Sequence, residues 1–324
     1  MSAGRLTDVP GVRVGHWSDP GVPTGCTVVL PPDGMVGAVD IGGGGASTRE
    51  TGLFTPGFGE RAVSALVLSG GSAFGLATAD GVMRWCEENG RGMDTGGAVV
   101  PIVPAAVIYD LGIGGGRPRP GAEEGYAACR AASVAPHAIG SVGAGTGATV
   151  GKWHAQRGWC KGGIGAASDR TPGGHTVAAL AVVNAFGDIL DERGDVLAGV
   201  WVPGRGFAGA TALAREESPV HPRLAEGRNT TLVAVVTDAP IGGVGAGQVA
   251  RMCRAGLGRA VSPVGTPIDG DVTFCLAAPG TENAFVAGML AAEVVAEAIR
   301  AGVRAATSLG GVPTADERRR GGRG

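Results

Sequence analysis

The stretch NTTLVAVVTDA, residues 229–239, indicates how this chain folds. Its centre, residues 231–236, is a near-continuous apolar run of the kind found in strands that are covered on both faces. The preceding residues 204–228 are polar and irregular, and a loop of this length is uncommon inside a compact domain. The sequence therefore predicts a buried strand that begins abruptly after Asn229, preceded by an exposed loop that is either a domain linker or a processing region.

Similar apolar runs occur on both sides of this strand and alternate with helical patterns. The expected strands cover residues 26–30, 62–68, 105–111, 177–183 and 272–277, and residues 188–190 and 196–200 are expected to form a hairpin. Amphipathic helices are expected over 72–88, with Ser72 as its N-cap, over 248–257 and over 284–301. The polar residues 315–324 are expected to form a disordered tail.

Composition excludes several classes of protein. The 324 residues include 62 Gly in clusters, which indicates tight turns and backbone packed closely against backbone or ligand. The net charge is −2 without a basic stripe, so we expect no nucleic-acid partner. The longest apolar run, residues 98–109, contains two prolines and is too short to span a bilayer, and no apolar signal core opens the chain. We therefore expect no membrane segment.

The cysteines and histidines show no metal-binding pattern. The six cysteines are scattered and the five histidines have no paired spacing, so we expect no metal and no cofactor, and buried free thiols in a reducing cytoplasm. No G-x-S-x-G element is present, which argues against hydrolysis by a Ser-His-Asp triad.

Lysine usage singles out one glycine-rich region. Only Lys152 and Lys161 are lysines among 27 basic residues, and both lie in that region. A lysine can lose its proton near neutral pH when its surroundings lower its pKa, whereas arginine cannot, so both are candidates for chemistry. The alternative, a lysine at the surface without a role, stays open for each. The glycine run 143–151 and Lys152 do not form a phosphate-binding loop. Such a loop needs Gly at position 146 and Ser or Thr at position 153, whereas this chain has Thr146 and Trp153, so we expect no nucleotide site.

Three further segments carry residues suited to catalysis. Thr230 is a weak nucleophile that its own free α-amino group could activate, provided the preceding peptide bond is cut. Asp269 and Asp271 are separated by one glycine and can face one pocket, and Asn184 ends an expected strand. Taken singly, each also fits a structural role: a β-branched residue in a strand, an ordinary turn and a capping Asn.

Together these segments resemble the DmpA-type peptidases, the family of L-aminopeptidase/D-esterases and β-aminopeptidases that also contains the endo-type 6-aminohexanoate oligomer hydrolase. The matching blocks are LTDVPGVRVGHWSD at 6–19, PTGCTVVL at 23–30, STRET at 47–51, LSGGSAFGLATADGVMRW at 68–85, AAVIYDL at 105–111, GAGTGATVGK at 143–152, KGGIG at 161–165, VVNAFGDILD at 182–191, NTTLVAVVTDA at 229–239 and DGD at 269–271. The resemblance covers nearly the whole chain.

This resemblance implies one α/β domain over residues 1–324, a four-layer αββα sandwich of the N-terminal-nucleophile-hydrolase type. It also implies self-cleavage between Asn229 and Thr230, which would give chains of residues 1–229 and 230–324. Thr230 rather than Thr231 is the expected nucleophile, because the family places it eight residues before the aspartate that is Asp238 here. Many relatives have Gly-Ser at the junction, and aminopeptidases with a Ser nucleophile often carry Ser and Glu where this chain has Asp269 and Asp271. Asn-Thr-Thr and Asp-Gly-Asp instead resemble the nylon-oligomer hydrolase branch.

By the same resemblance, five residues are expected around Thr230: Lys152, Asn184, Asp269, Asp271 and Tyr109. The two aspartates would orient the hydroxyl and the amine, Lys152 would lower the pKa of the amine, and the Asn184 amide would donate to the oxyanion. Tyr109 would assist the oxyanion or the leaving group, or simply pack in its strand. The glycine run 143–151 would form a backbone wall beside the scissile carbonyl.

The implied activity is that of a cofactor-free amide hydrolase, cytoplasmic and homo-oligomeric as a tetramer or larger. It would act on small peptides or amide oligomers with a free amine end. Two alternatives remain: an acyltransferase of the ornithine acetyltransferase type, and a non-catalytic binding member of the fold.

Overall fold

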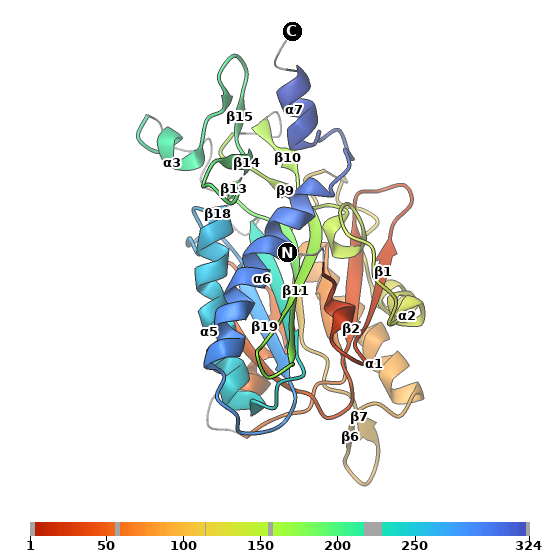
Figure 1. Ribbon diagram of the computed structural model, residues 1–324. Helices are drawn as coiled ribbons and strands as arrows, with labels where there is room; N and C mark the ends of the chain where they lie inside the picture. Colours follow the sequence, from red (N-terminus) through yellow and green to blue (C-terminus); the bar gives the residue numbers. More distant parts are fainter. Residues whose placement is uncertain (1–3, 56–58, 114, 155–157, 217–228, 322–324) are drawn as a thin grey trace.

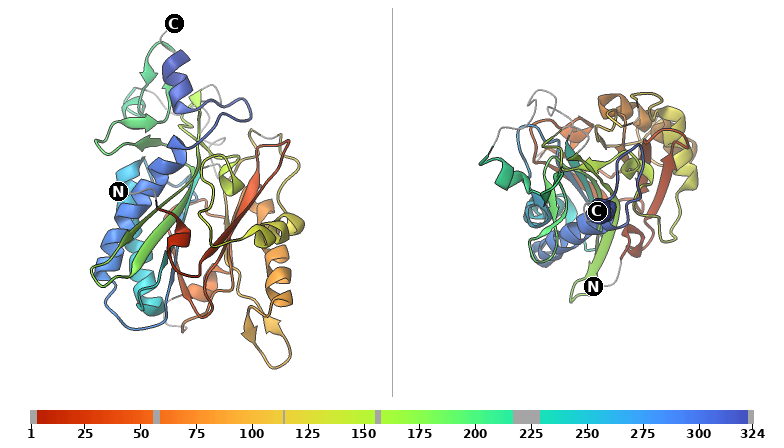
Figure 2. Two further views of the ribbon diagram at one scale, coloured as in Figure 1. Left: turned by 45° about the vertical axis from the view of Figure 1, so that its right-hand side comes forward. Right: turned by 90° about the horizontal axis from the view of Figure 1, so that it is seen from above.

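The computed structural model describes residues 4–55, 59–113, 115–154, 158–216 and 229–321. Two five-stranded sheets lie face to face, and a layer of helices covers the outer face of each (Figures 1 and 2). The first sheet contains, in order, β1 (Arg13–Ser18), β2 (Gly25–Leu30), β5 (Leu66–Ser69), β8 (Ala105–Val107) and β4 (Thr48–Arg49). The second contains β11 (Gly163–Arg170), β12 (Thr176–Asn184), β17 (Thr230–Thr237), β19 (Val272–Ala277) and β3 (Val36–Ile41).

Four long helices form the outer layers. The first sheet is covered by α1 (Thr78–Glu88) and α2 (Ala122–Ala131), and the second by α5 (Gly242–Ala260) and α6 (Phe285–Arg304). Shorter elements complete the described chain: β6 (Met93–Asp94), β7 (Val99–Val100), β9 (Thr149–Val150), β10 (Cys160–Lys161), β13 (Asp188–Leu190), β14 (Val196–Ala198), β15 (Trp201–Val202), β16 (Gly206–Phe207), α3 (Ala210–Leu213), β18 (Val261–Ser262) and α7 (Ala315–Gly321).

Most buried apolar side chains belong to three layers that match this arrangement. One lies between the sheets and includes Leu68, Ile108 and Phe274. A second joins the β12–β17 side to helices α5 and α6, and a third joins β2, β5 and β8 to α1 and α2. Burying apolar surface on both faces of each sheet is the main stabilising contribution. The expected four-layer αββα sandwich is thus confirmed.

Close backbone contact explains part of the glycine excess. A Cβ on Gly165 of β11 would lie 2.1 Å from the carbonyl oxygen of Ala298 and 2.3 Å from the amide nitrogen of Gly302, both in α6. Strand and helix therefore pack backbone against backbone at this point, which no larger residue allows.

Most predicted elements are present, with differences at their ends. The strands expected at 26–30, 177–183, 231–236 and 272–277 match β2, β12, β17 and β19, and the hairpin is β13–β14. The run at 62–68 forms a strand only from Leu66, the run at 105–111 only to Val107, and the helix expected at 248–257 extends over Gly242–Ala260.

Two predictions about chain ends and caps are wrong. Ser72 is not a helix N-cap: it has a φ of 54° and opens a 3-10 helix, Ser72–Ala77, that precedes α1. The tail expected to be disordered contains α7 at Ala315–Gly321, because its arginines bond to other parts of the chain, as described below. Residues 322–324 lie outside the described residues, as do residues 217–228 of the long loop expected before Asn229.

All six cysteines are free and buried, as expected. In the described part of the chain, no helix has the length and apolar character that crossing a membrane requires. Nor do His, Cys, Asp and Glu side chains in those residues gather into a group that could hold a metal ion.

Candidate functional site

Strand register brings the expected catalytic residues together. Strands β12 and β17 are antiparallel, and Asn184 at the end of β12 pairs with Thr230 at the start of β17. Thr231 pairs with Val183, and because side chains alternate along a strand, Thr230 and Thr231 face opposite sides of the sheet. Thr230, and not Thr231, is therefore paired with Asn184 and carries its hydroxyl on the same face of the sheet as the Asn184 side chain.

Two donors meet at the carbonyl oxygen of Asn229. The Thr230 hydroxyl lies 2.5 Å from this oxygen and donates to it, and the backbone N–H of Gly270 donates to it over 2.7 Å. Asn229 and Asp269 form a parallel bridge that holds the two segments in this position. The hydroxyl thus lies beside the carbonyl group of the preceding residue, and an amide N–H already polarises that carbonyl.

Lys152 and Asn184 form a buried pair next to the nucleophile candidate. The Nζ of Lys152 donates to Oδ1 of Asn184 over 2.7 Å and to its backbone oxygen over 2.9 Å. The N–H of Thr149 donates to the same Oδ1 over 3.1 Å. Since these partners are donors, the amide is oriented with its Nδ2 toward the backbone oxygen of Tyr109, 3.3 Å away. Lys152 is therefore buried and bonded, and is not a surface lysine.

The two aspartates hold the segment that carries Gly270. Asp271 accepts the N–H of Thr231 over 2.6 Å and that of Gly265 over 3.0 Å, whereas Asp269 accepts both the N–H and the hydroxyl of Thr266. Burial, and then the charge of Asp269, raises the pKa of Asp271 to about 6. Burial also raises the pKa of Asp269. The Asp271 carboxylate thus bonds to the backbone just after the junction, and the Asp269 carboxylate holds the turn before Gly270.

Lys161 has a different environment from Lys152. Its side chain is fully buried, and its Nζ donates to the backbone oxygens of Gly145, Ala148 and Gly162. Burial lowers the pKa of Lys161 to about 7. This lysine therefore supports the glycine-rich run from within the fold.

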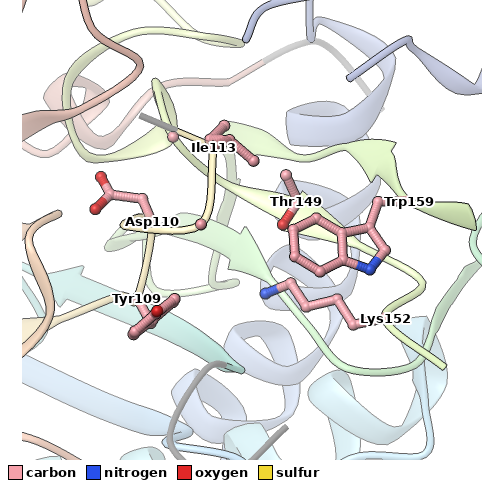
Figure 3. Close-up of a pocket in the computed structure, with 8 residues that line it drawn as sticks. Tyr109, Asp110, Ile113, Thr149, Lys152 and Trp159 are labelled. Atoms are coloured by element: carbon pink, nitrogen blue, oxygen red, sulfur yellow. The ribbon is translucent and has the colours of Figure 1, made fainter. Parts of the chain in front are cut away.

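A narrow cavity of about 10 Å³, room for about one water molecule, lies beside Lys152 (Figure 3). Its lining includes Tyr109, Ile113, Thr149 and Trp159, together with Gly112 and Gly147 of the glycine-rich segments. Figure 3 shows the indole ring of Trp159 facing Thr149 and Lys152, with the amine end of Lys152 toward Tyr109 and the carboxylate of Asp110 turned away. Asp110 is bonded elsewhere, to the Thr24 hydroxyl and the Gly71 N–H.

The structure brings together Thr230, Asn184 and Lys152 directly, and places Asp269, Asp271 and Tyr109 around them. Sequence reasoning missed Gly270 and Trp159. Gly270 lies inside the DGD motif, but a turn glycine gives no sign that its N–H faces a carbonyl 41 residues earlier. Trp159 belongs to no motif, so only the fold identifies it as a cavity wall.

Comparisons with known proteins point to one family. The model of peptidase family S58 matches residues 4–315. An uncharacterized aminopeptidase of Mycobacterium tuberculosis is 41% identical, with 95% of this chain and 96% of that protein covered. A 6-aminohexanoate-oligomer endohydrolase of Kocuria sp. is 30% identical, with 92% of this chain and 86% of that protein covered.

Solved structures of low sequence identity share the fold. The β-aminopeptidase of a Burkholderia species superposes with a TM-score of 0.72 at 21% identity, covering 98% of this chain and 94% of that one. The L-aminopeptidase D-Ala-esterase/amidase of Ochrobactrum anthropi, described as a variant of the Ntn hydrolase fold, gives 0.69 at 21% identity, covering 98% and 92%.

Proposed function

Because the chain belongs to peptidase family S58 and is a hydrolase of peptide or amide bonds, we propose that it cuts itself between Asn229 and Thr230 and then uses Thr230 as an N-terminal nucleophile. The observation that carries this proposal is the meeting of the Thr230 hydroxyl and the Gly270 N–H at the Asn229 carbonyl. Attack on a carbonyl carbon needs a nearby nucleophile and a donor for the oxygen that becomes negative, and both are present.

Self-cleavage proceeds in two steps. Oγ of Thr230 attacks the carbonyl carbon of Asn229, the C–N bond breaks, and the nitrogen takes the hydroxyl proton to become a free α-amine. Asn229 is then joined to Thr230 by an ester. Water hydrolyses this ester, which leaves a carboxylate on Asn229 and restores the hydroxyl of Thr230. The Gly270 N–H stabilises the oxyanion in this reaction.

In the cleaved protein the α-amine of Thr230 serves as the base. An α-amine has a pKa of about 7.7–8.0, so it can take the hydroxyl proton as Oγ attacks a substrate amide. The positive charge of Lys152, held near it by Asn184, disfavours the ammonium form of this amine. The Nδ2 of Asn184 donates to the substrate oxyanion, and Tyr109 lines the adjoining cavity.

The two aspartates act through the backbone of the junction. Asp271 fixes the N–H of Thr231 and Asp269 fixes the turn before Gly270, so together they place the nucleophile against its donor. For the cleaved protein we also predict that the carboxylates of Asp269 and Asp271 contact the free amine of Thr230. Substrates are small peptides or amide oligomers with a free amine end, as the names of the relatives suggest.

The proposal extends to assembly and location. Several large apolar side chains at the starts of α5 and α6 are exposed: Val244 (77%), Phe285 (61%), Val286 (43%) and Met289 (52%). An apolar patch of this kind is typical of a protein interface, which supports a homo-oligomer, proposed as a tetramer or larger. Six free thiols fit a reducing compartment such as the cytoplasm. Size-exclusion chromatography with light scattering, repeated on Phe285→Glu, tests the assembly.

Two matched variants test the nucleophile. Thr230→Val and Thr231→Val each remove one hydroxyl and keep the shape of a β-branched residue. We expect wild type and Thr231→Val to give fragments of 229 and 95 residues by intact mass, with the second beginning at Thr230. Thr230→Val should stay uncut and inactive. Cleavage of Thr230→Val at the same bond would show that another group is the nucleophile.

A further inference from the structure

The last described part of the chain, residues 307–321, contacts residues that line the cavity beside Lys152. Its helix α7 lies near β10 and β15 at the end of the molecule where the chain terminates (Figure 1). The Nη2 of Arg318 donates to the backbone oxygen of Trp159 over 2.9 Å. The backbone oxygen of Pro313 accepts the N–H of Lys161 over 2.8 Å. The C-terminal segment, residues 307–321, is thus bonded to the backbone of Trp159, a wall of the cavity, and to that of Lys161, two residues further along the chain.

The same segment also approaches the opposite wall. A Cβ on Gly310 would lie 3.2 Å from the backbone oxygen of Ile113, so the two backbones are close to contact. Ile113 and Trp159 both line the cavity. One continuous segment therefore contacts the backbones of two walls that are 46 residues apart in sequence.

Helix α7 is fixed in place by more than Arg318. The Nη2 of Arg319 donates to the backbone oxygens of Leu197 and Val196, and its guanidinium stacks over the ring of Phe207 at 5.0 Å. A helix of seven residues has no stability of its own. Its position depends on these contacts, which in turn allow Arg318 to hold Trp159.

The wall that Arg318 holds determines how wide the cavity is. The indole Nε1 of Trp159 donates to the backbone oxygen of His154, and its ring lies 3.6 Å from where a Cβ on Gly112 would be. The cavity holds about one water molecule, so a small displacement of this ring changes what can enter. Its aromatic and aliphatic walls, Trp159, Tyr109 and Ile113, suit a small uncharged group.

We propose that the C-terminal segment shapes a substrate subsite, with Arg318 as the positioning residue that fixes Trp159 and thereby limits the size of the apolar group accepted beside the scissile amide. This inference rests on the proposed function. It also implies that the subsite is completed by both products of self-cleavage, since the walls belong to residues 1–229 and the segment that fixes them belongs to residues 230–324.

The test compares Arg318→Gln with Arg320→Gln, a matched control from the exposed side of the same helix. Both variants and wild type are assayed with alanyl and leucyl p-nitroanilide, and their self-cleavage is followed by intact mass. For Arg318→Gln we expect normal self-cleavage, KM for the alanyl amide raised about 5- to 10-fold with kcat nearly unchanged, and a lower ratio of alanyl to leucyl kcat/KM. Arg320→Gln should match wild type in all of these.

A second variant probes the cavity from the other side. Gly112→Ala adds a methyl group 3.6–3.8 Å from the rings of Trp159 and Tyr109, at an ordinary contact distance, so the protein should fold. It narrows the cavity and should raise the ratio of alanyl to leucyl kcat/KM, opposite to the change in Arg318→Gln. Hydrogen exchange provides a readout without substrate: the peptide containing Lys161 should exchange faster in Arg318→Gln than in Arg320→Gln.

The outcomes distinguish failure of the proposed hydrolase function from failure of the subsite inference. If wild type neither cuts itself nor hydrolyses either amide, the proposed function fails, and hydrogen exchange still tests whether Arg318 fixes this region. If wild type is active but Arg318→Gln keeps both the wild-type ratio of kcat/KM and the wild-type exchange, the segment does not shape the subsite. An equal loss of kcat on both amides, with KM unchanged, would show a general structural role and overturn the inference.

Discussion

The most direct perturbation of the proposed self-cleavage is Gly270→Ala. A Cβ at this position would lie 2.7 Å from the Thr230 hydroxyl oxygen, 3.1 Å from the backbone oxygen of Gly45 and 3.3 Å from the Cα of Ala46. Gly270 does not have a positive φ, so an alanine keeps the backbone without strain. The nearest neighbour, and the one most able to move, is the hydroxyl that is proposed to attack.

The expected loss follows from this geometry. Carbon and oxygen atoms do not normally approach within 3.0 Å, so the hydroxyl must move by several tenths of an ångström or rotate away from the Asn229 carbonyl. A displacement of about 1 Å costs about 10²-fold in rate, so a smaller one should slow self-cleavage about 10- to 100-fold. This is about 1.4–2.7 kcal/mol in activation free energy.

The assay is a time course of intact mass on freshly purified protein, fitted to a single rate constant for disappearance of the full-length chain. Gly42→Ala is the matched control, because its Cβ would meet only the Cβ and backbone oxygen of Asp271, both at 3.9 Å. It should cut itself at the wild-type rate. A wild-type rate for Gly270→Ala would refute the placement of the hydroxyl against this backbone, and equal slowing in Gly42→Ala would indicate a general disturbance of the loop.

Three further predictions concern the charged residues. Lys152→Met removes both hydrogen bonds that Nζ donates to Asn184 and should lower kcat/KM for an alanyl amide at least about 100-fold while circular dichroism stays unchanged. The pKa of Asp271 is raised to about 6, so self-cleavage should slow as pH falls through 6 and the carboxylate takes a proton, and a pH–rate profile of Asp271→Asn should lack this limb. The pKa of Lys161 is lowered to about 7 in the folded chain, so between pH 7 and about 10.4 the unfolded chain binds the additional proton. The free energy of unfolding should therefore increase with pH over this range, by at most about 1.4 kcal/mol per pH unit, and urea titrations on the uncut Thr230→Val background should show a smaller slope in Lys161→Met.

The elements that sequence alone predicts are those whose apolar side chains are large. Residues 232–236 and 177–183 are runs of Val, Leu and Ala that pack between other layers, and their strand character is evident from the run itself. Helix α2, Ala122–Ala131, was missed because its buried face consists of Gly125, Ala128 and Cys129. Small residues allow close packing, but they produce only a weak apolar periodicity.

The candidate site likewise has features that the sequence reveals and features that only the fold reveals. Side chains with unusual chemistry, such as Thr230 after a polar loop or two lysines in an arginine-rich chain, could be singled out from the sequence. The contact between the Gly270 N–H and the Asn229 carbonyl could not, because both groups belong to the backbone and the two segments are brought together by the parallel pairing of β17 with β19 and by the bridge between Asn229 and Asp269. The choice of Thr230 over Thr231 rested on the family resemblance. Strand alternation and the pairing with Asn184 now support it independently.

The two lysines show why an unusual residue is not by itself evidence of catalysis. Both are buried, and in both cases an ammonium group fits where a planar guanidinium would not: three backbone oxygens converge on Lys161, and two oxygens of one residue converge on Lys152. Packing therefore accounts for lysine at both positions. Only Lys152 contacts the residue that pairs with Thr230, so only there does the geometry add a chemical reason to the structural one. Replacing each lysine separates the two roles: loss of Lys152 should affect turnover first, and loss of Lys161 should affect the stability of the fold first.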